Sequence, residues 1–426
     1  MKTVDLFFLY SIISIWIMLV YQLILAFGGY SYYKKLYDQK DVMDLAIKAY
    51  KNWPTVSILI PAHNEERVIE KTVRSVLSMD YPKEKLELIV INDNSSDKTG
   101  EILKKLKERI NGNLKIITTT KENGGKGKSN ALNIGFEESN GEIIGIYDAD
   151  NTPNINALKY LVYQIQINKN YGAVIGKFRT RNKKRNPLTR FINIETLSFQ
   201  WLSQGGRYFI FGFATIPGTN FVIRRSIVEE LGGWDIKAIT EDTEVSIRIY
   251  LLGYEIGFMP LSVTFEQEPE TLRVWFKQRL RWVKGNLYVI HKYLFKVIKM
   301  KSFRIALDIF YFFSTYFIFL TSVVISDLIF ILGLIGQYYG TDLFTVNVPG
   351  NFLIVWLLAY TLFILEISIV LYFEKGEGNF SNFIYTLLMY FTYCQLWIVL
   401  SIHALISYIK DLIYKKEFKW VKTERF

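Results

Sequence analysis

Cysteine and histidine are both scarce in this chain. Its 426 residues include one cysteine, Cys394, which lies inside an apolar run. A single thiol excludes an internal disulfide framework and a cysteine-based metal cluster. The three histidines, His63, His291 and His403, are far apart in the sequence, so we expect no zinc site built from them. Internal repeats and low-complexity tracts are also lacking.

Acidic charge is in the minority. The 51 lysines and arginines outnumber the 40 aspartates and glutamates, and 50% of all residues are hydrophobic. Nucleic-acid binding is one interpretation of the net charge of +11. Because many of the cations flank apolar runs, we favour a cytoplasmic surface next to anionic lipid and expect no nucleic-acid partner. The apolar content fits a soluble domain joined to a membrane region better than one large core.

The first apolar run, Leu6–Phe27, is long enough to cross a bilayer. It lacks the strongly basic start and the clear cleavage site of a signal peptide. We therefore predict a retained transmembrane helix over residues 1–30. Lysines follow it in a linker over residues 31–53, and the positive-inside rule then places the next domain in the cytoplasm.

Three apolar stretches occupy the C-terminal part, over 305–336, 352–373 and 383–409. They predict a transmembrane region over 303–409, followed by a basic tail over 410–426. The first stretch is either one tilted span or an interfacial helix followed by a span. The tail's charge favours the cytoplasm, whereas three crossings would put it outside, so the number of crossings stays open. We expect a multi-pass protein of the plasma membrane.

The middle of the chain, residues 54–270, alternates short apolar runs with helical stretches. The apolar runs, rich in β-branched residues, are Val56–Ile60, Leu86–Ile91, Lys115–Thr118, Glu142–Tyr147 and Ala173–Ile175. The helical stretches between them include 65–79, 97–109 and 129–138. This alternation predicts an α/β domain with a mostly parallel sheet covered by helices on both faces.

Polar side chains follow several predicted strands at the point where each strand ends. They are His63-Asn64-Glu65, Asp93, and the pair Asp148 and Asp150. Since the carboxyl ends of parallel strands meet at one edge of a sheet, where ligands bind, we expect a single site there. Two carboxylates at i and i+2 can hold one hard cation, Mg²⁺ or Mn²⁺, although an isolated pair of this kind is common in solvated turns.

Two further segments carry cations. Lys126–Asn133 opens a helix after a glycine-rich loop, and amides at a helix start together with Lys128 favour an anion. The spacing of a Walker A loop is absent, and dinucleotide binding is unsupported. In Gln278-Arg279-Leu280-Arg281-Trp282, positions i, i+3 and i+4 share one helix face. We expect Arg279 to point to another face as a surface charge. The whole segment is predicted to belong to amphipathic interfacial helices over residues 271–302.

The order of Asp93, Asp148/Asp150, Thr240-Glu241-Asp242 and the Q-x-x-R-W motif resembles the processive family 2 glycosyltransferases. These are membrane synthases of cellulose, chitin, hyaluronan and poly-N-acetylglucosamine. The resemblance covers roughly residues 54–300, and the membrane part matches only in layout. It implies a GT-A type nucleotide-sugar-binding domain inserted between transmembrane α-helices.

The resemblance also implies a role for each motif residue. It assigns donor binding to Pro61, His63, Glu65, Asp93, Lys128, Asp148, Gln278 and Arg281. Asp242 would act as the general base of an inverting transfer. Acceptor binding would belong to Thr219, Glu241 and Trp282, and the metal to Asp148 and Asp150, where it would neutralise the leaving diphosphate.

Several of these residues also have a purely structural interpretation. Asn64 could cap the helix that begins at Glu65, and Ser96 or Asp97 the next helix. Asp242 could cap a helix over 244–252. We expect Asp235 to form a turn rather than to act as a second base. The segment Gly218-Thr219-Asn220 could simply lead into a strand. The basic stretch Arg179–Arg190 could attract lipid headgroups or an acidic partner, but we expect a solvated loop.

The predicted function is that of a processive inverting β-glycosyltransferase. It would polymerise UDP-N-acetylglucosamine or UDP-glucose into an extracellular polysaccharide and extrude it, with a membrane lipid environment and a small accessory membrane subunit as further partners. One alternative is a non-processive membrane enzyme that glycosylates a lipid. Another is a non-catalytic transporter or scaffold with a degenerate transferase domain.

Overall fold

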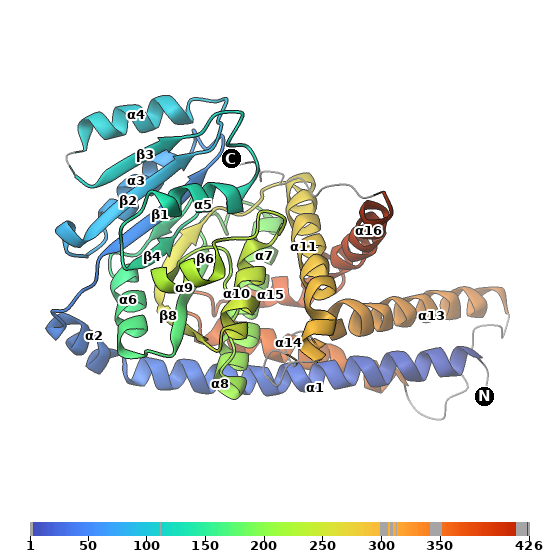
Figure 1. Ribbon diagram of the computed structural model, residues 1–426. Coiled ribbons are helices and arrows are strands. Elements are labelled where there is room, and N and C mark those ends of the chain that lie inside the picture. Colours follow the sequence, from blue (N-terminus) through green and yellow to red (C-terminus); the bar gives the residue numbers. More distant parts are fainter. Residues whose placement is uncertain are drawn as a thin grey trace.

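The computed structural model describes residues 3–110, 112–298, 306, 310–311, 313–340, 352–414 and 424. Within them, an α/β domain stands on a layer of long helices (Figure 1). The strands of this part of the chain form one eight-stranded sheet in the order β3-β2-β1-β4-β7-β6-β8-β5. The order puts the first four strands of the sequence together in one half of the sheet.

That half is parallel throughout. Its strands are β1 (Val56–Ala62), β2 (Leu86–Asn92), β3 (Leu114–Thr118) and β4 (Ile143–Ile146). The connecting helices are α3 (Ile69–Leu77), α4 (Thr99–Arg109) and α5 (Lys128–Glu137), with the short 3₁₀ turn η1 (Lys83–Lys85) before β2. The predicted strands and the helices between them are thereby confirmed.

Alternating residues of β1 enter two different cores. Leu59 packs with Leu132 of α5 in one core, whereas Ile58 and Ile60 pack with Ile69 of α3 in the other. Because both faces are covered, the strands are continuously apolar rather than alternating. The predicted helix-covered sheet is therefore confirmed.

The other half of the sheet is mixed. It contains β5 (Thr152–Pro153), β6 (Tyr171–Thr180), β7 (Phe221–Arg224) and β8 (Glu255–Glu266). Strand β7 runs antiparallel to both β4 and β6, β8 runs parallel to β6, and β5 runs antiparallel to β8. Strands β5 and β7 therefore run in the opposite direction to the other strands of the sheet.

Other helices of the described residues connect or flank these strands. They are α2 (Lys40–Ala49), α6 (Ala157–Ile167), α7 (Pro187–Ser198), the π-helical segment η2 (Phe199–Gly206), α8 (Arg207–Phe211), α9 (Arg225–Leu231), α10 (Glu241–Leu251) and α11 (Leu272–Ile298). The later helices are the π-helical segment η3 (Ser314–Phe319), α13 (Leu320–Tyr339), α14 (Phe352–Phe373), α15 (Phe380–Met389) and α16 (Tyr393–Ile413). The first helix of the chain is α1 (Thr3–Asp38).

Three helical segments of the described chain are long and apolar enough to cross a membrane: α1, Phe317–Tyr339 and α16. Helices α1 and α13 run side by side in the long layer (Figure 1). Along α1, Phe7, Ile17 and Phe27 are exposed, as expected where lipid replaces water. These helices suggest a membrane protein.

The apolar stretch expected over 383–409 is two helices, α15 and α16, separated by a turn near residues 390–392. Most of the basic tail predicted over 410–426 lies outside the described residues.

The basic stretch Arg179–Arg190 is not the solvated loop that the sequence suggested. Arg179 Nη2 lies 2.8 Å from Glu377 Oε1, and Lys183 also pairs with Glu377. Beside them, Lys177 Nζ lies 2.9 Å from Glu374 Oε2, and both side chains are buried. Glu374 and Glu377 belong to the turn between α14 and α15, so the acidic partner of this stretch lies nearly two hundred residues further along the same chain.

Candidate active site

A cavity of about 410 Å³ opens at the carboxyl ends of β1, β2 and β4, between the sheet and helices α10 and α11. The predicted site residues that line it are Pro61, His63, Glu65, Asp93, Lys128, Asp148, Asp150, Glu241, Asp242, Gln278, Arg281 and Trp282. The structure therefore brings these residues together around one cavity at this sheet edge, as the sequence led us to expect. These residues come from segments between β1 and α11 that are far apart in the sequence.

Thr219 is the exception among the predicted site residues. It is buried, and its hydroxyl accepts a hydrogen bond from the backbone N–H of Asp148 (3.0 Å) and donates to the side chain of Asn151. It therefore supports the loop after β4 from behind. This placement favours a structural role over the predicted contact with an acceptor.

The loops after β1 and β2 have left-handed backbone at asparagines. Asn64 has φ +55° and Asn94 has φ +50°, a region that asparagine tolerates better than other side chains with a Cβ. The prediction that Asn64 caps a helix at Glu65 is wrong, because α3 begins only at Ile69. The Asn64 side-chain oxygen instead accepts from Ser96 N (2.7 Å), which ties the two loops together.

Asp93 directly follows β2 and precedes Asn94, the second asparagine with left-handed backbone. Its Oδ1 accepts hydrogen bonds from the hydroxyl of Thr119 (2.9 Å) and from the N–H of Gly125 (2.8 Å). His63 Nδ1 lies 2.6 Å from the Asp93 carbonyl oxygen. The carboxylate is thus held in place on the cavity wall by the glycine-rich loop that leads to Lys128.

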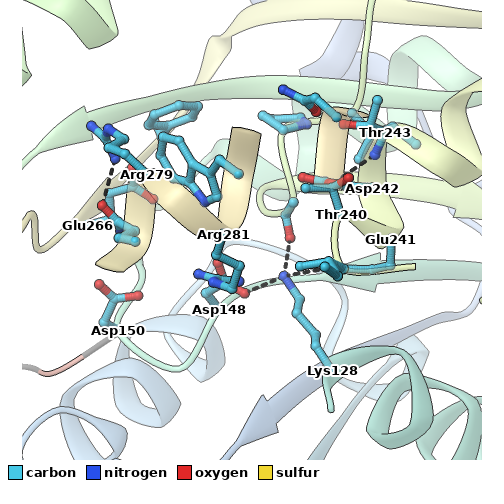
Figure 2. A pocket seen from close by; sticks show the side chains of 18 of the residues that line it. Lys128, Asp148, Asp150, Thr240, Glu241, Asp242, Thr243, Glu266, Arg279 and Arg281 are labelled. Atoms are coloured by element: carbon cyan, nitrogen blue, oxygen red, sulfur yellow. Dashed lines mark hydrogen bonds and ion pairs between the residues drawn. The ribbon is translucent and has the colours of Figure 1, made fainter. Parts of the chain in front are cut away.

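Lys128 is the centre of the charge arrangement. Its Nζ lies 2.6 Å from Asp148 Oδ1 and 3.2 Å from Glu241 Oε1, and it donates to the Gly218 carbonyl at 2.7 Å (Figure 2). Burial alone would lower the pKa of Lys128, but Asp148 and Glu241 raise it above its ordinary value. The lysine therefore stays a cation and joins the loop after β4 to the start of α10.

Asp150 is the second member of the carboxylate pair. It is buried, its Oδ2 accepts from the N–H of Gln267 (2.9 Å), and its carbonyl accepts from Arg181 Nη1 (3.2 Å). Within the described residues, no three His, Cys, Asp or Glu side chains are grouped as a metal site. Asp148 and Asp150 both line the cavity, and two carboxylates supply only part of an oxygen ligand set, so a divalent ion there would take its remaining ligands from a bound diphosphate and water.

Asp242 lies in the first turn of α10, one residue after Glu241, so it is not the cap of that helix. Its Oδ1 accepts from the N–H of Thr243 (2.8 Å). Burial and the neighbouring Glu241 raise the pKa of Asp242 to about 7. Gly218, with φ +90°, lies so close that a Cβ there would be 2.9 Å from Asp242 Oδ2. A carboxylate with this pKa can exchange a proton near neutral pH.

Asp235 lies away from this centre. Its Oδ2 lies 2.7 Å from Lys292 Nζ, and its Oδ1 accepts from Lys237 N (2.9 Å). The residue does not line the cavity. Its expected role in a turn agrees with these contacts.

Helix α10 packs closely on α11 at the start of the T-E-D motif. A Cβ on Gly285 of α11 would lie 2.3 Å from Thr240 Cγ2, so only glycine allows this approach. Further along, the buried Glu244 accepts from Lys292 (2.7 Å) and Tyr293 (2.6 Å) of α11. The helix that carries Asp242 is thereby fastened to the helix that carries the Q-x-x-R-W motif.

The Q-x-x-R-W segment lies on α11, as predicted, and Arg281 points from this helix toward Asp148 (Figure 2). The expectation that Arg279 is a surface charge is wrong. Arg279 is 1% exposed, lines the cavity, and its Nη2 lies 2.8 Å from Glu195 Oε2 of α7. Helix periodicity relates a residue only to its own helix, and here α7 covers the face that was expected to be open.

Several other residues that line the cavity carry no signal in the sequence. Glu195, Phe199, Ser203, Tyr311, Thr315 and Trp397 come from α7, η2, the η3 region and α16. They form a wall of the cavity that comes from helical segments outside the sheet. Each lies in an apolar or amphipathic stretch without a motif, so only the packing of these helices identifies it.

The chain was also compared with known proteins. The family model of glycosyl transferase family 2 matches residues 57–232. A probable glycosyltransferase of Bacillus subtilis (strain 168), YdaM, is 50% identical over 419 residues, which cover 98% of this chain and 97% of that protein. The poly-β-1,6-N-acetyl-D-glucosamine synthase of Staphylococcus aureus (strain COL) is 35% identical over 248 residues, 58% of each protein.

A similar solved structure is the mannosyltransferase PcManGT of Pyrobaculum calidifontis, in complex with GDP-mannose and Mn²⁺. It matches with a TM-score of 0.56 and 18% identity, over 92% of this chain and 100% of that chain. At this identity the likeness concerns the fold, and it supports the predicted GT-A type architecture.

Proposed function

This chain belongs to glycosyl transferase family 2 and is a hexosyltransferase, and on that premise we propose a metal-dependent, inverting enzyme that polymerises a UDP-sugar at a membrane. The favoured donor is UDP-N-acetylglucosamine, because the relative in Staphylococcus aureus is named as the synthase of that sugar's β-1,6 polymer. UDP-glucose is the second choice. The product would be an extracellular polysaccharide.

One observation carries the proposal. Lys128 Nζ lies 2.6 Å from Asp148 and 3.2 Å from Glu241, and the adjacent Asp242 faces the same cavity. A cation for a diphosphate, a carboxylate pair for a metal and a carboxylate of raised pKa are thus within one enclosed space. An inverting sugar transfer needs these groups and no covalent nucleophile.

The proposed reaction is a single displacement. The acceptor hydroxyl oxygen forms a bond to the anomeric carbon of the donor as the bond from that carbon to the diphosphate breaks. Asp242 takes the hydroxyl proton, and Lys128 and Arg281 stabilise the charge of the departing UDP. Bound Mg²⁺ or Mn²⁺, held by Asp148 and Asp150, would add further positive charge there, as the Mn²⁺ complex of the similar mannosyltransferase supports.

The loops after β1 and β2 bring four residues to the cavity, and we propose that they bind the nucleoside: Pro61, His63, Glu65 and Asp93. Trp282 would hold the acceptor sugar, with Glu241 close to Asp242. The resemblance assigned Gln278 to the donor, but Gln278 lies one turn before Trp282 on the same face of α11, so we propose that it contacts the acceptor instead. Past Trp282, aromatic rings and hydroxyl groups such as Tyr311, Trp397 and Thr315 line the cavity. Such a wall suits a sugar chain, whose rings have apolar faces and polar edges.

The candidate spans support a membrane location, and we propose a cytoplasmic catalytic domain, where nucleotide sugars are made. A small accessory membrane subunit remains part of the proposal by analogy with the family.

A lipid acceptor is the second candidate, and one observation favours it. An apolar pocket of about 280 Å³ lies between α11, α13 and α16, lined by residues such as Val283, Leu320 and Leu405. Val283 follows Trp282 directly, so a lipid chain in this pocket could present its head group to the cavity. An enzyme of this kind would add one sugar to a lipid rather than build a polymer.

The test is UDP release by the purified full chain in lipid vesicles with a panel of nucleotide sugars and Mn²⁺ or Mg²⁺. Asp242→Asn should abolish release, whereas Asp235→Asn, the same change outside the cavity, should not. A long product from one donor, lost in Asp242→Asn, supports the polymerising enzyme. A lipid-sized product favours the lipid acceptor, and release that persists in Asp242→Asn contradicts the assigned base.

A further inference from the structure

Arg279 is an unassigned residue of the Q-x-x-R-W segment, yet it is among the most buried large side chains of the described chain. An arginine is rarely buried unless its guanidinium is paired. Here Nη2 lies 2.8 Å from Glu195 Oε2 of α7 and 3.9 Å from Glu268 Oε2, which follows β8. The side chain is therefore fixed between elements that come from three parts of the chain.

The partners of Arg279 are themselves fixed. Tyr393 at the start of α16 donates to Glu195 Oε2 (2.7 Å), and Trp275 Nε1 donates to the Tyr393 hydroxyl (2.9 Å). Glu268 is buried, and its N–H donates to Asn182 Oδ1 (2.9 Å). A guanidinium held by partners that cannot easily move is a rigid support for whatever it touches.

Arg279 touches two residues that are proposed to meet the acceptor. Its Nη1 donates to Gln278 Oε1 at 2.6 Å. Its guanidinium carbon lies 4.0 Å from the centre of the Trp282 ring, within the range of a cation–π contact. One face of the indole is therefore covered, and the amide of Gln278 has its oxygen turned toward the arginine.

We propose that Arg279 is a positioning residue for the acceptor sugar, acting through Trp282 and Gln278. With one indole face covered by the guanidinium, the sugar stacks on the other face. With the Gln278 oxygen engaged, its NH₂ group is presented as a donor to a sugar hydroxyl. The inference rests on the proposed function and deepens it, since it assigns acceptor orientation to a residue that touches neither the diphosphate nor the base.

Charge and shape are both needed in this role. A lysine keeps the charge but lacks the planar fork that can face Glu195, Gln278 and an aromatic ring together. A methionine keeps the length but leaves Glu195 and Glu268 without their cation. Arg279→Lys should therefore be the milder change and Arg279→Met the stronger one.

The experiment separates the use of the donor from the use of the acceptor. Full-length variants in lipid vesicles are given UDP-N-acetylglucosamine, Mn²⁺ and increasing amounts of N-acetylglucosamine oligosaccharide. Both UDP release and the split between free sugar and extended oligosaccharide are measured. For Arg279→Met we expect a donor KM within about twofold of wild type and an acceptor KM raised about tenfold, the effect of one lost cation–π contact. The share of donor lost to hydrolysis should rise, and Arg279→Lys should fall between.

Arg273 supplies the matched control, because it is an exposed arginine on the same helix. Arg273→Met should leave both KM values and the product split unchanged. Thermal unfolding of each variant shows whether it is folded, and Arg279→Lys keeps the test usable if Arg279→Met is not.

Two results would overturn the proposal while leaving the enzyme intact: an equal loss of hydrolysis and transfer, or an acceptor KM that does not move. If wild type neither hydrolyses nor transfers any donor, the proposed function fails first, and the role of Arg279 fails with it because no acceptor step remains.

Discussion

Gly218 offers a sharp test of the placement of Asp242. The residue has φ +90°, and a Cβ built on it would lie 2.9 Å from Asp242 Oδ2 and 3.7 Å from Lys128 Nζ. Gly218→Ala therefore adds one methyl group directly against the proposed base. The substitution changes no charge and removes no hydrogen-bonding group.

The expected loss follows from these distances. Ordinary contact begins at 3.4 Å, so the carboxylate or the loop must move by about 0.5 Å, the difference between 3.4 and 2.9. Displacements approaching 1 Å at a reacting group can lower the rate by about 10²-fold. The alanine also adopts an unfavourable backbone conformation, at a cost of about 1–3 kcal/mol in the free energy of unfolding.

Gly253 separates the two effects. Its φ is +89°, nearly that of Gly218, and no atom lies within 4 Å of a Cβ built there. Gly253→Ala should therefore lower thermal stability about as much as Gly218→Ala but keep most of the activity. UDP release at saturating donor and metal, beside a thermal unfolding curve, provides the comparison. Equal activity in the two variants would refute the inferred position of the base.

Three further outcomes are expected. Because burial and Glu241 raise the pKa of Asp242 to about 7, and the base works as a carboxylate, kcat/KM should rise with pH through about 7. Glu241→Gln removes the neighbouring carboxylate that raises this pKa, so the midpoint of the rise should move to lower pH, and an unmoved midpoint would assign the rise to another group. Asp150→Asn should raise the Mn²⁺ concentration for half-maximal activity by at least about tenfold, the size of losses from outer-shell changes; an unchanged metal requirement would remove Asp150 from the metal site. Glu374→Ala leaves a buried lysine without its partner and should cost about 3–5 kcal/mol in unfolding free energy. Glu70→Ala, at an exposed pair with 51% and 52% of the two side chains accessible, should cost at most about 1 kcal/mol by the same thermal measurement.

The α/β domain could be predicted because its signals are local. Continuous β-branched runs such as Val56–Ile60 and Leu86–Ile91 indicate strands covered on both faces, and the structure has them as β1 and β2. Their parallel pairing then places the residues that follow, including Asp93, at one sheet edge. Predicting the strands and predicting where they end both depend on short sequence segments, and neither requires knowing which helices pack on the sheet.

The mixed half of the sheet was harder to foresee. Strand β7 is short, and the sequence allowed only a strand entry near Gly218–Asn220. Whether such a segment pairs parallel or antiparallel depends on the route of the chain between strands, which periodicity does not record.

The details of the site depended on which helix covers which face. Residue spacing placed Gln278, Arg281 and Trp282 on one face of α11, but it could not show that α7 brings Glu195 against Arg279. It also could not show that Thr240 rests on Gly285. Such contacts join segments whose separation in sequence carries no periodic signal.

The same reason applies to the turn between α14 and α15. By itself the sequence determined where strands, helices and chemically active side chains occur, because hydrophobic periodicity and turn chemistry act over a few residues. Only the tertiary structure decided that Glu374 meets Lys177 and that Arg279 is buried. The fate of a charge depends on the partner and the solvent that surround it after folding, and both come from distant parts of the chain.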